Sequence, residues 1–372
     1  DAWRRAYRRE LLLIAAQDLT AADPHALQPA VSAALSDLAA AALEGALALA
    51  RAEMGPGAEQ VRLAVLGMGK TGGRELIYVV EPGHGQSEEE AVRLGSKLAA
   101  SLARMCSMPS AEPPLWEVDA GLRPEGRNGP LVRTLASHVQ YYQRWAQTWE
   151  FQALLKARPA AGDEDLGRAY VEALSPMVWE AVNRENFVED SQAMRRRVED
   201  HVPVAEADRQ IKLGRGGLRD VEFTVQLLQL VHGRVDAGLR SPNTLEALTQ
   251  LSDAGYVGRD HADELAELYQ FLRLLEHRVQ LHRMRRTHLF PTAEADLRHL
   301  ARSIGYGPDG VGELTNRWRL TRRRVRQLHE EIFYRPLLPA TARLSAADAA
   351  LSPESAAARL AAIGYRDPVG AV

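Results

Sequence analysis

Cysteine is almost absent from this chain of 372 residues, because Cys106 is the only one. A single cysteine excludes a disulfide bond within the chain and is typical of the reducing cytoplasm. We also find no apolar run that approaches membrane-spanning length and no signal-peptide pattern. These absences predict a cytoplasmic protein that is not a membrane protein.

An excess of positive charge is also lacking. Lys and Arg number 46 and Asp and Glu number 49, which gives a formal net charge of −3 and argues against a dedicated nucleic-acid binder. The hydrophobic content of 46% is sufficient for real cores, and the length is typical of two or three domains. The chain begins at Asp1 without Met and stops mid-pattern at Val372, so we expect a fragment.

The most informative segment is a glycine-rich loop that follows a short apolar run. Residues 63–66 predict a buried strand, and four glycines and a lysine follow it. Glycine lets backbone N–H groups approach phosphate oxygens closely, and a lysine adds a positive charge for the same anion. The sequence therefore predicts a phosphate-binding loop formed by Gly67, Gly69, Lys70, Gly72 and Gly73.

This loop matches neither of two common phosphate-binding fingerprints. In a P-loop the lysine follows the second glycine, whereas Lys70 precedes its glycine pair. The glycine spacing fits a dinucleotide fingerprint, but the residues after Arg74 continue as an extended apolar run instead of a helix. On the loop alone, a tight turn between two strands stays open as an alternative.

A second candidate segment places an acid at the end of a predicted strand. Residues 116–120 predict the strand, and Asp119 either holds a metal near the phosphates or caps the strand end. Arg123 follows, where it either binds phosphate through two guanidinium nitrogens or pairs with Glu125. Together with the loop, this segment indicates a phosphate and carboxylate–metal site.

A third candidate segment contains three glycines, at 214, 216 and 217, before a predicted helix over 218–233. Lys212, Arg215 and Arg219 surround the helix N-terminus, which is itself an anion site. The alternative is a capped helix with solvated charges. Glu222 shares a helical face with Arg219, so it either pairs with that arginine or lines the site.

The remaining pattern is mostly helical. Apolar runs predict strands at residues 62–67, 77–81, 116–120 and 131–134, and helical periodicity predicts long helices at 31–54, 87–105, 138–158 and 218–233. The helix over 138–158 carries an aromatic stripe that we expect in a core, formed by Tyr141, Tyr142, Trp145, Trp149 and Phe151.

Three arginine-rich runs, at 195–197, 283–286 and 322–324, are interpreted as solvated faces. A docking surface for an acidic partner protein is the second interpretation. His277 and His282 do not share a helical face, so we exclude a metal site there.

Four segments in this order resemble motifs of the bifunctional glutamine synthetase adenylyltransferase/adenylyl-removing enzyme family. Segment 67–76 resembles its nucleotidyltransferase loop and 116–126 its second acidic strand. Segment 149–158 resembles its W-E-x-x-A-x-x-K-A-R helix, and 211–223 its K-x-G-x-G-G-[IL]-R-[DE]-[IV]-E-F signature. The tail from 333 resembles the exit of the N-terminal, adenylyl-removing half.

The resemblance implies an α+β, mostly helical fold, with a nucleotidyltransferase-type mixed sheet domain followed by a helical bundle domain. We therefore expect N-terminal helices over 1–57, the nucleotidyltransferase-like domain over 58–163 and the helical domain over 164–338. Residues 339–372 are expected to be the start of a linker or helical region that leads to a missing C-terminal half.

The implied reaction is phosphorolysis of AMP from an adenylylated tyrosine of glutamine synthetase, releasing ADP. The implied partners are glutamine synthetase, nucleotide, phosphate and the PII signal protein. The alternatives are the forward adenylyltransferase, which uses ATP, and a non-catalytic regulatory domain. The implied catalytic residues are Lys70 and Asp119, and Asp119 is also an implied Mg²⁺ ligand. The residues implied to bind nucleotide and phosphate are Gly67, Gly69, Gly72, Gly73, Arg74, Arg123, Lys212, Arg215 and Arg219.

The chain departs from the family at one place. After R-E-L the family continues as N-[YF]-x-S-D-x-D, whereas here Ile77 follows Leu76 at once. The missing segment includes both aspartates of the D-x-D pair, which would be the main Mg²⁺ ligands. We expect a flexible loop at this point, so that the Cα atoms of Leu76 and Ile77 are farther apart than the about 3.8 Å of a trans peptide. A true loss of the segment would favour the non-catalytic alternative.

Overall fold

The computed structural model describes residues 1–69, 74–335, 338, 357, 360 and 370. The chain forms two compact units, which are described separately. The first comprises 1–18 and 29–178, and the second comprises 19–28 and 179–372. The boundaries at 57, 163 and 338 stay a prediction, and most of the segment 339–372 lies outside the described residues.

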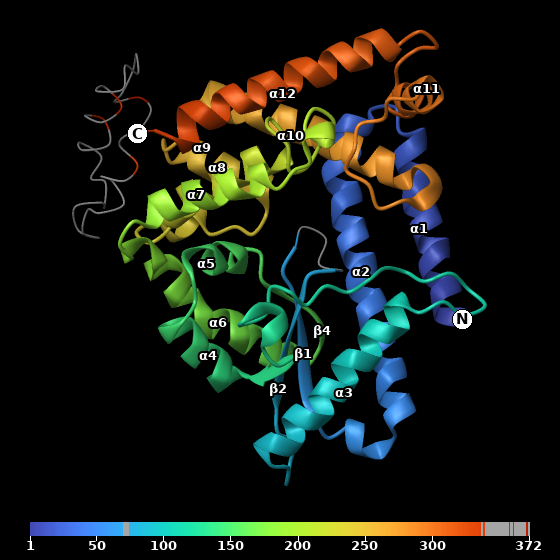
Figure 1. Ribbon diagram of the computed structural model, residues 1–372, viewed down its shortest axis with the longest axis vertical. Helices are drawn as coiled ribbons and strands as arrows, with labels where there is room; N and C mark the ends of the chain where they lie inside the picture. Colours follow the sequence, from blue (N-terminus) through green and yellow to red (C-terminus); the bar gives the residue numbers. More distant parts are fainter. Residues whose placement is uncertain (70–73, 336–337, 339–356, 358–359, 361–369, 371–372) are drawn as a thin grey trace. The chain divides into compact units, whose positions relative to one another are not determined.

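A four-stranded mixed sheet lies at the centre of the first unit (Figure 1). Its strands are β1 (Arg62–Gly67), β2 (Leu76–Glu81), β3 (Val132–Thr134) and β4 (Arg158–Gly162), in the order β3-β2-β1-β4. β1 is antiparallel to β2 and β4, whereas β2 and β3 are parallel. β1 and β2 are buried almost throughout, as is typical of strands covered on both faces.

Helices α2 and α3 complete the core of this unit with the sheet. Leu43 and Leu47 of α2 and Leu98 and Leu102 of α3 are fully buried in one cluster with strand residues such as Val65. Burying one such side chain contributes about 1.5–3 kcal/mol. The helices of this part of the chain are α1 (Ala2–Thr20), α2 (Pro24–Met54), α3 (Glu88–Ser107), α4 (Leu135–Arg144), α5 (Thr148–Leu154) and α6 (Glu164–Glu180).

Among the described residues, α2 is the one helix that is long and apolar enough to cross a membrane, by length and composition only. The expectation that no apolar run approaches that length is therefore wrong. In this stretch 33% of the residues are buried, and Leu43, Ala46 and Leu47 belong to the core. Packing inside the unit accounts for part of its apolar character, and a single helix of this kind is weak evidence for a membrane span.

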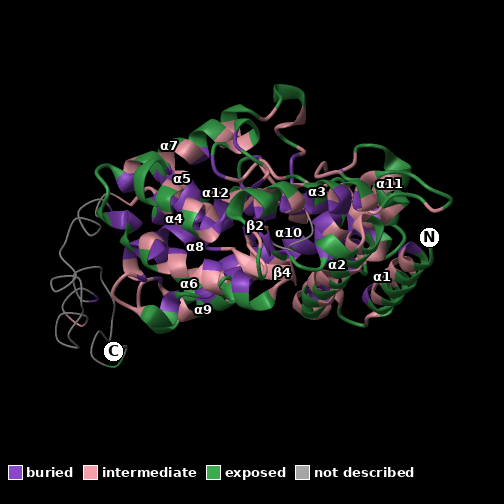
Figure 2. Ribbon diagram, turned by 90° about the horizontal axis from the view of Figure 1, so that it is seen from below, coloured by how far each residue is buried: buried purple, intermediate pink, exposed green. Residues whose placement is uncertain are grey.

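The second unit is helical in its described part. α8 is buried on nearly every side, and α9, α10 and α12 pack against it (Figure 2). Its buried residues include polar and charged side chains such as Asp220 and Glu222, which therefore need partners inside the unit. The helices of this unit are α7 (Phe187–Asp200), α8 (Leu218–His232), α9 (Thr244–Asp253), α10 (Arg259–Leu281), α11 (Glu294–Ser303) and α12 (Val311–Phe333).

The α+β, mostly helical class is confirmed, but two predicted elements are wrong. Residues 116–120 form no strand, because their only ladder contact is an isolated bridge between Asp119 and Glu75. The predicted helix over 138–158 is instead two helices followed by β4. Pro159 favours extended backbone at Arg158 and is tolerated in β4, which is an edge strand.

The break between α4 and α5 also changes the aromatic stripe. Trp145 caps the end of α4, and the residue is 68% exposed, so its assignment to the core is wrong. Tyr142 and Phe151 are buried as predicted.

Candidate functional site

The glycine-rich loop connects β1 and β2 as an antiparallel hairpin. Gly67 pairs with Leu76, and the Met68 N–H donates to the Glu75 carbonyl oxygen at 2.8 Å. A Cβ on Gly69 would lie 2.5 Å from a Glu75 carboxylate oxygen, but this is the end of a flexible side chain that can move away, so space alone does not require glycine here. The hairpin agrees with the alternative of a turn between two strands.

The hairpin neither supports nor opposes the predicted binding of phosphate by this loop. Lys70, Gly72 and Gly73 lie outside the described residues, so their contacts with phosphate stay a prediction. Arg74 is half-buried directly after them, at the entry to β2.

Leu76 and Ile77 are consecutive residues of β2, paired with Gly67 and Leu66 of β1. The expected break between them is therefore wrong. Because both residues belong to one continuous ladder, the chain has no D-x-D pair at this junction.

The backbone of Asp119 forms hydrogen bonds with the hairpin. Its N–H donates to the Arg74 carbonyl oxygen at 2.7 Å, and its carbonyl oxygen accepts from the Leu76 N–H at 2.9 Å. Its side chain is exposed, and Oδ1 accepts a hydrogen bond from the Gly121 N–H at 2.8 Å. The Asp119 backbone thus lies beside Arg74 and Leu76, and the turn fits the alternative role of its side chain as a local cap, while its metal role stays a prediction.

The residues present here do not fit a divalent ion. Nucleotidyltransferases generally use one. In the ranges that the structure describes, no three His, Cys, Asp or Glu side chains are grouped closely enough to hold a metal. Asp119 without the D-x-D pair does not supply the several oxygen ligands that Mg²⁺ needs.

Arg123 makes structural contacts. Its guanidinium donates to three backbone carbonyl oxygens, those of Ala120, Arg127 and Gly129, at 2.8, 3.1 and 3.2 Å. Glu125 pairs instead with Arg133, at 2.7 Å. The Arg123–Glu125 pair is therefore not formed. A phosphate would compete with these carbonyls for the guanidinium.

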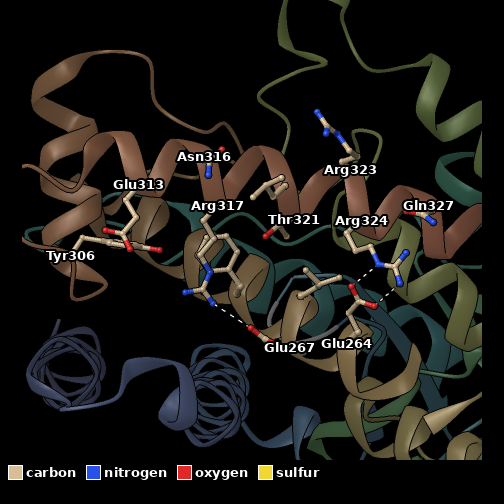
Figure 3. Close-up of a pocket in the computed structure, with 13 residues that line it drawn as sticks. Glu264, Glu267, Tyr306, Glu313, Asn316, Arg317, Thr321, Arg323, Arg324 and Gln327 are labelled. Carbon is tan, nitrogen blue, oxygen red and sulfur yellow. Dashed lines mark hydrogen bonds and ion pairs between the residues drawn. The ribbon is translucent and has the colours of Figure 1, made fainter. Parts of the chain in front are cut away.

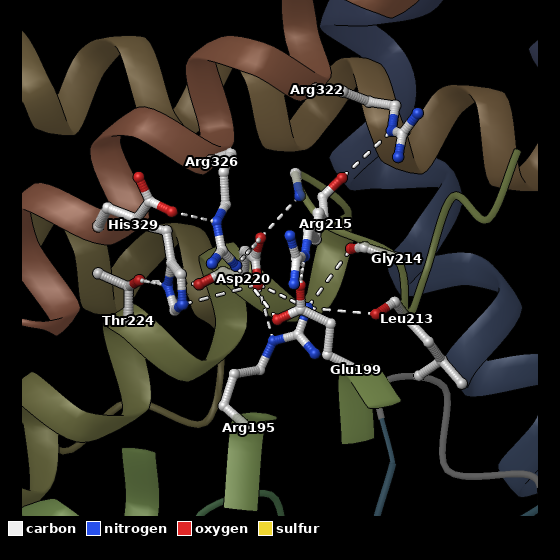
Figure 4. Close-up of polar contacts among 12 residues, drawn as sticks. Arg195, Glu199, Leu213, Gly214, Arg215, Asp220, Thr224, Arg322, Arg326 and His329 are labelled. Carbon is white, nitrogen blue, oxygen red and sulfur yellow. Dashed lines mark hydrogen bonds and ion pairs between the residues drawn. The ribbon is translucent and has the colours of Figure 1, made fainter. Parts of the chain in front are cut away.

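The third predicted segment is organised around Asp220, in the first turn of α8 (Figure 4). Its side chain is fully buried; Oδ1 lies 2.6 Å from Nη2 of Arg195, and Oδ2 accepts from the Gly216 N–H at 2.7 Å. Arg195 also donates to the carbonyl oxygens of Leu213 and Gly214, at 3.2 and 3.4 Å. The interpretation of residues 195–197 as a solvated face is therefore wrong for Arg195.

His329 of α12 completes this buried cluster. Its Nδ1 lies 2.8 Å from the Thr224 hydroxyl, and its Nε2 lies 3.6 Å from Oδ1 of Asp220. Burial lowers the pKa of His329 to about 4, although the Asp220 carboxylate opposes this shift. The imidazole is therefore neutral at physiological pH.

Gly216 has a structural reason to be glycine. Its φ is +70°, and a Cβ would lie 1.9 Å from the Arg322 carbonyl oxygen. Arg322 in turn donates to the carbonyl oxygens of Asp208, Ala207 and Arg215, at 2.6, 3.0 and 3.2 Å. The glycine-rich segment and α12 are thus in direct backbone contact.

The three predicted cations of the segment are tied into the turn before α8 by their backbone and by separate partners. The Arg219 N–H donates to the Lys212 carbonyl oxygen at 2.9 Å, and Arg215 is exposed in the turn between them. Arg219 pairs with the buried Glu222 at 3.0 Å, so the pairing alternative is confirmed. Arg215 pairs with Glu199. Their binding to nucleotide stays a prediction.

Sequence reasoning missed an arginine-lined cavity of about 250 Å³ in the second unit, which is a shallow depression largely open to solvent. The signal that could have found it is helical spacing, because four of its residues recur at i, i+3, i+4 and i+7 along α12. The lining residues are Arg215, Arg319, Arg322, Arg323 and Arg326.

A larger cavity, of about 560 Å³, lies between α10 and α12 (Figure 3). Its charged side chains are largely paired across the two helices. The Arg324 guanidinium donates to the Glu264 carboxylate at 2.7 Å, and the Arg317 guanidinium lies 3.7 Å from the Glu267 carboxylate. This cavity has no excess of one charge that would favour a particular ligand.

The fold and the ordered segments define a protein of the nucleotidyltransferase type. Residues 1–173 match the family model "Glutamate-ammonia ligase adenylyltransferase", and residues 192–333 match that of "GlnD PII-uridylyltransferase". These matches, with the relatives below, place the chain in the family of bifunctional glutamine synthetase adenylyltransferase/adenylyl-removing enzymes.

Three curated proteins with that name illustrate the likeness. The one from Streptomyces coelicolor is 56% identical over 380 residues, covering 99% of this chain and 38% of the relative. Those from Bifidobacterium longum and Nocardia farcinica are each 50% identical, over 404 and 378 residues, covering 100% and 99% of this chain and 37% of each relative. The chain thus spans less than two fifths of these relatives. Because the alignments are longer than the chain, the relatives carry residues that it lacks.

Proposed function

We propose that this chain is the adenylyl-removing, N-terminal part of an enzyme of this family, that it works in the cytoplasm, and that its substrate is adenylylated glutamine synthetase. The observation that supports this most strongly is the 56% identity, across 99% of the chain, to an enzyme of that name. The tail from residue 333 favours the N-terminal half.

The proposed reaction is phosphorolysis. An oxygen of inorganic phosphate forms a bond to the phosphorus of the tyrosine-linked AMP, and the bond from that phosphorus to the tyrosine oxygen breaks. ADP leaves, and the tyrosine regains its hydroxyl proton. Positioning and charge neutralisation supply most of the acceleration in such a displacement.

Most of the candidate residues have a role in this proposal. Backbone N–H groups of the 67–73 loop and the Lys70 ammonium bind phosphate oxygens, and Asp119 faces them. Lys212, Arg215 and Arg219 bind the nucleotide. Mg²⁺ is the proposed ion of the family's reaction, and it would need the D-x-D pair as well as Asp119, so this chain without the pair would not hold it. The PII signal protein is the proposed regulatory partner.

One observation favours a second candidate function. β2 runs directly from Leu76 to Ile77 without the D-x-D pair. A chain of this kind recognises adenylylated glutamine synthetase but does not turn it over. It would then be a regulatory domain.

The direction of transfer is tested with glutamine synthetase that carries radiolabelled AMP. The preparation is this chain with a segment of the pattern N-[YF]-x-S-D-x-D inserted between Leu76 and Ile77. We expect label release as ADP that depends on phosphate, and no net labelling of unmodified glutamine synthetase from labelled ATP. Labelling from ATP without phosphate-dependent release would assign the forward activity instead. Binding without transfer in either direction would assign the regulatory role.

A further inference from the structure

The arginine-lined cavity of the second unit suggests a ligand of its own. We propose that it binds a dianionic phosphate group, carried either by free orthophosphate or at the end of a nucleotide. The cavity is formed by Arg215 and by four arginines of α12, and this proposal does not rest on the proposed reaction. Figure 4 shows three of the five arginines, Arg215, Arg322 and Arg326.

Helical geometry brings four of these guanidinium groups to one place. Arg319, Arg322, Arg323 and Arg326 lie at i, i+3, i+4 and i+7, which is one face of α12. Arg215 joins them because its neighbour Gly216 lets the glycine-rich segment approach the α12 backbone. Two parts of the chain that are about a hundred residues apart in sequence thus supply one cluster.

Nearby carboxylates neutralise only part of this charge. Glu199 pairs with both Arg215 and Arg326, and the distance to Arg326 is 3.2 Å. Glu330 also pairs with Arg326, at 2.6 Å, and Asp208 lies 3.6 Å from Arg322. Asp220, 3.8 Å from Arg326, already pairs with the buried Arg195.

Two arginines of the cavity keep an unbalanced charge. Arg319 and Arg323 are exposed, and within the part of the chain that the structure describes they form no hydrogen bond or ion pair. Their two charges match the charge of about −1.5 to −2 that a phosphate monoester carries at neutral pH. A bound phosphate group would relieve the repulsion between them.

The lining fits a phosphate group better than a whole nucleotide. Every lining residue is an arginine, whose planar fork binds phosphate through two parallel hydrogen bonds. The volume of about 250 Å³ is below the roughly 300–1,000 Å³ typical of sites for larger organic ligands. Arg322 already donates to three carbonyl oxygens, which would compete with a phosphate, so Arg319 and Arg323 carry most of the proposed binding.

The test is equilibrium dialysis of the whole chain against radiolabelled orthophosphate and, separately, ATP labelled in its terminal phosphate. The variant R319Q/R323Q removes the two unpaired charges, and glutamine keeps the helix propensity close to that of arginine. The matched control is R285Q/R286Q, which removes two other exposed arginines of the same unit and the same net charge.

We expect saturable binding of one or both ligands, weakened at least about tenfold in R319Q/R323Q, since each guanidinium supplies a charge-assisted hydrogen bond. The control should bind within about twofold of the parent, as a substitution outside the site does. Saturation by orthophosphate identifies the free anion as the ligand, and saturation by ATP alone identifies a nucleotide's terminal phosphate. Equal weakening in both variants, competition by adenosine, or no saturable binding of either ligand would overturn the proposal.

Discussion

The guanidinium of Arg195 and the carboxylate of Asp220 form a completely buried ion pair, with Nη2 and Oδ1 2.6 Å apart. The pair ties α7 to the first turn of α8. Through Gly216 and the carbonyl oxygens of Leu213 and Gly214, it also fixes the glycine-rich segment before α8. The conformation of that segment therefore depends on two charges that solvent does not reach.

Replacing Asp220 with Asn should destabilise the second unit by about 3–5 kcal/mol, because Arg195 is then left buried without a counter-charge. Urea denaturation followed by circular dichroism measures the loss. Asp309→Asn is the matched control, since Asp309 is exposed, and it should change stability by less than about 0.5 kcal/mol. Equal stability of the two variants would show that the buried pair contributes nothing.

Gly216→Ala should lower the thermal unfolding midpoint markedly. The new Cβ would meet the Arg322 carbonyl oxygen, and the positive φ is itself unfavourable for alanine. Gly312→Ala is the control on α12 itself, because nothing lies within 4 Å of its Cβ position. Alanine in a helix should leave the midpoint unchanged or raise it. The account is contradicted when the two variants shift the midpoint in the same direction by similar amounts.

The two buried histidines should make the fold sensitive to acid. Burial lowers the pKa of His329 to about 4 and that of His138 to about 3, both below the about 6.5 of an unfolded chain. Above pH 6.5 both states are neutral and the stability is full. As the pH falls from about 6.5 towards 4, the unfolded chain gains protons first, so stability is lost.

His329→Gln should therefore flatten the decline in stability between pH 7.5 and pH 5, measured by urea unfolding at each pH. His84→Gln is the control, because His84 is exposed and should leave the decline as it is in the parent. An unchanged slope in His329→Gln would mean that other groups cause the acid sensitivity.

Local patterns in the sequence predicted much of the fold. The strand over 62–67 and the helix over 218–233 were recognised because strand runs and helical periodicity are local signals. The strand β4 differs from the predicted helix because Pro159 favours extended backbone at Arg158, whereas no glycine or proline marks the break at Trp145.

The site was predicted less completely, because its contacts join distant residues. The local sequence pattern predicts a solvated charge at Arg195, because its partner Asp220 is 25 residues away and burial depends on tertiary packing. The arginine-lined cavity combines Arg215 with residues of α12. The metal role of Asp119 stays a prediction, and the continuous strand β2 at Leu76 differs from the expected break.

Asp119→Asn should leave the fold intact and abolish transfer. Asparagine retains the side-chain oxygen that accepts from the Gly121 N–H, so we expect the stability to stay within about 0.5 kcal/mol. In the chain with the inserted D-x-D segment, loss of this carboxylate should slow AMP release at least about 100-fold. Glu117→Gln is the control, because Glu117 is also exposed and lies two residues upstream. Activity that survives in Asp119→Asn would make the carboxylate structural.

We propose that this chain has the fold of an adenylyl-removing unit but, at the Leu76–Ile77 junction, not the D-x-D pair of the family pattern. The most direct measurement compares phosphate-dependent release of AMP from adenylylated glutamine synthetase by the natural chain and by the chain with the D-x-D segment inserted between Leu76 and Ile77. We predict equal binding of adenylylated glutamine synthetase by both chains and ADP release at least about 100-fold faster with the insertion, because metal ligation is worth several kcal/mol in such a transition state. Equal rates in both chains, or failure of both to bind adenylylated glutamine synthetase, would contradict the claim.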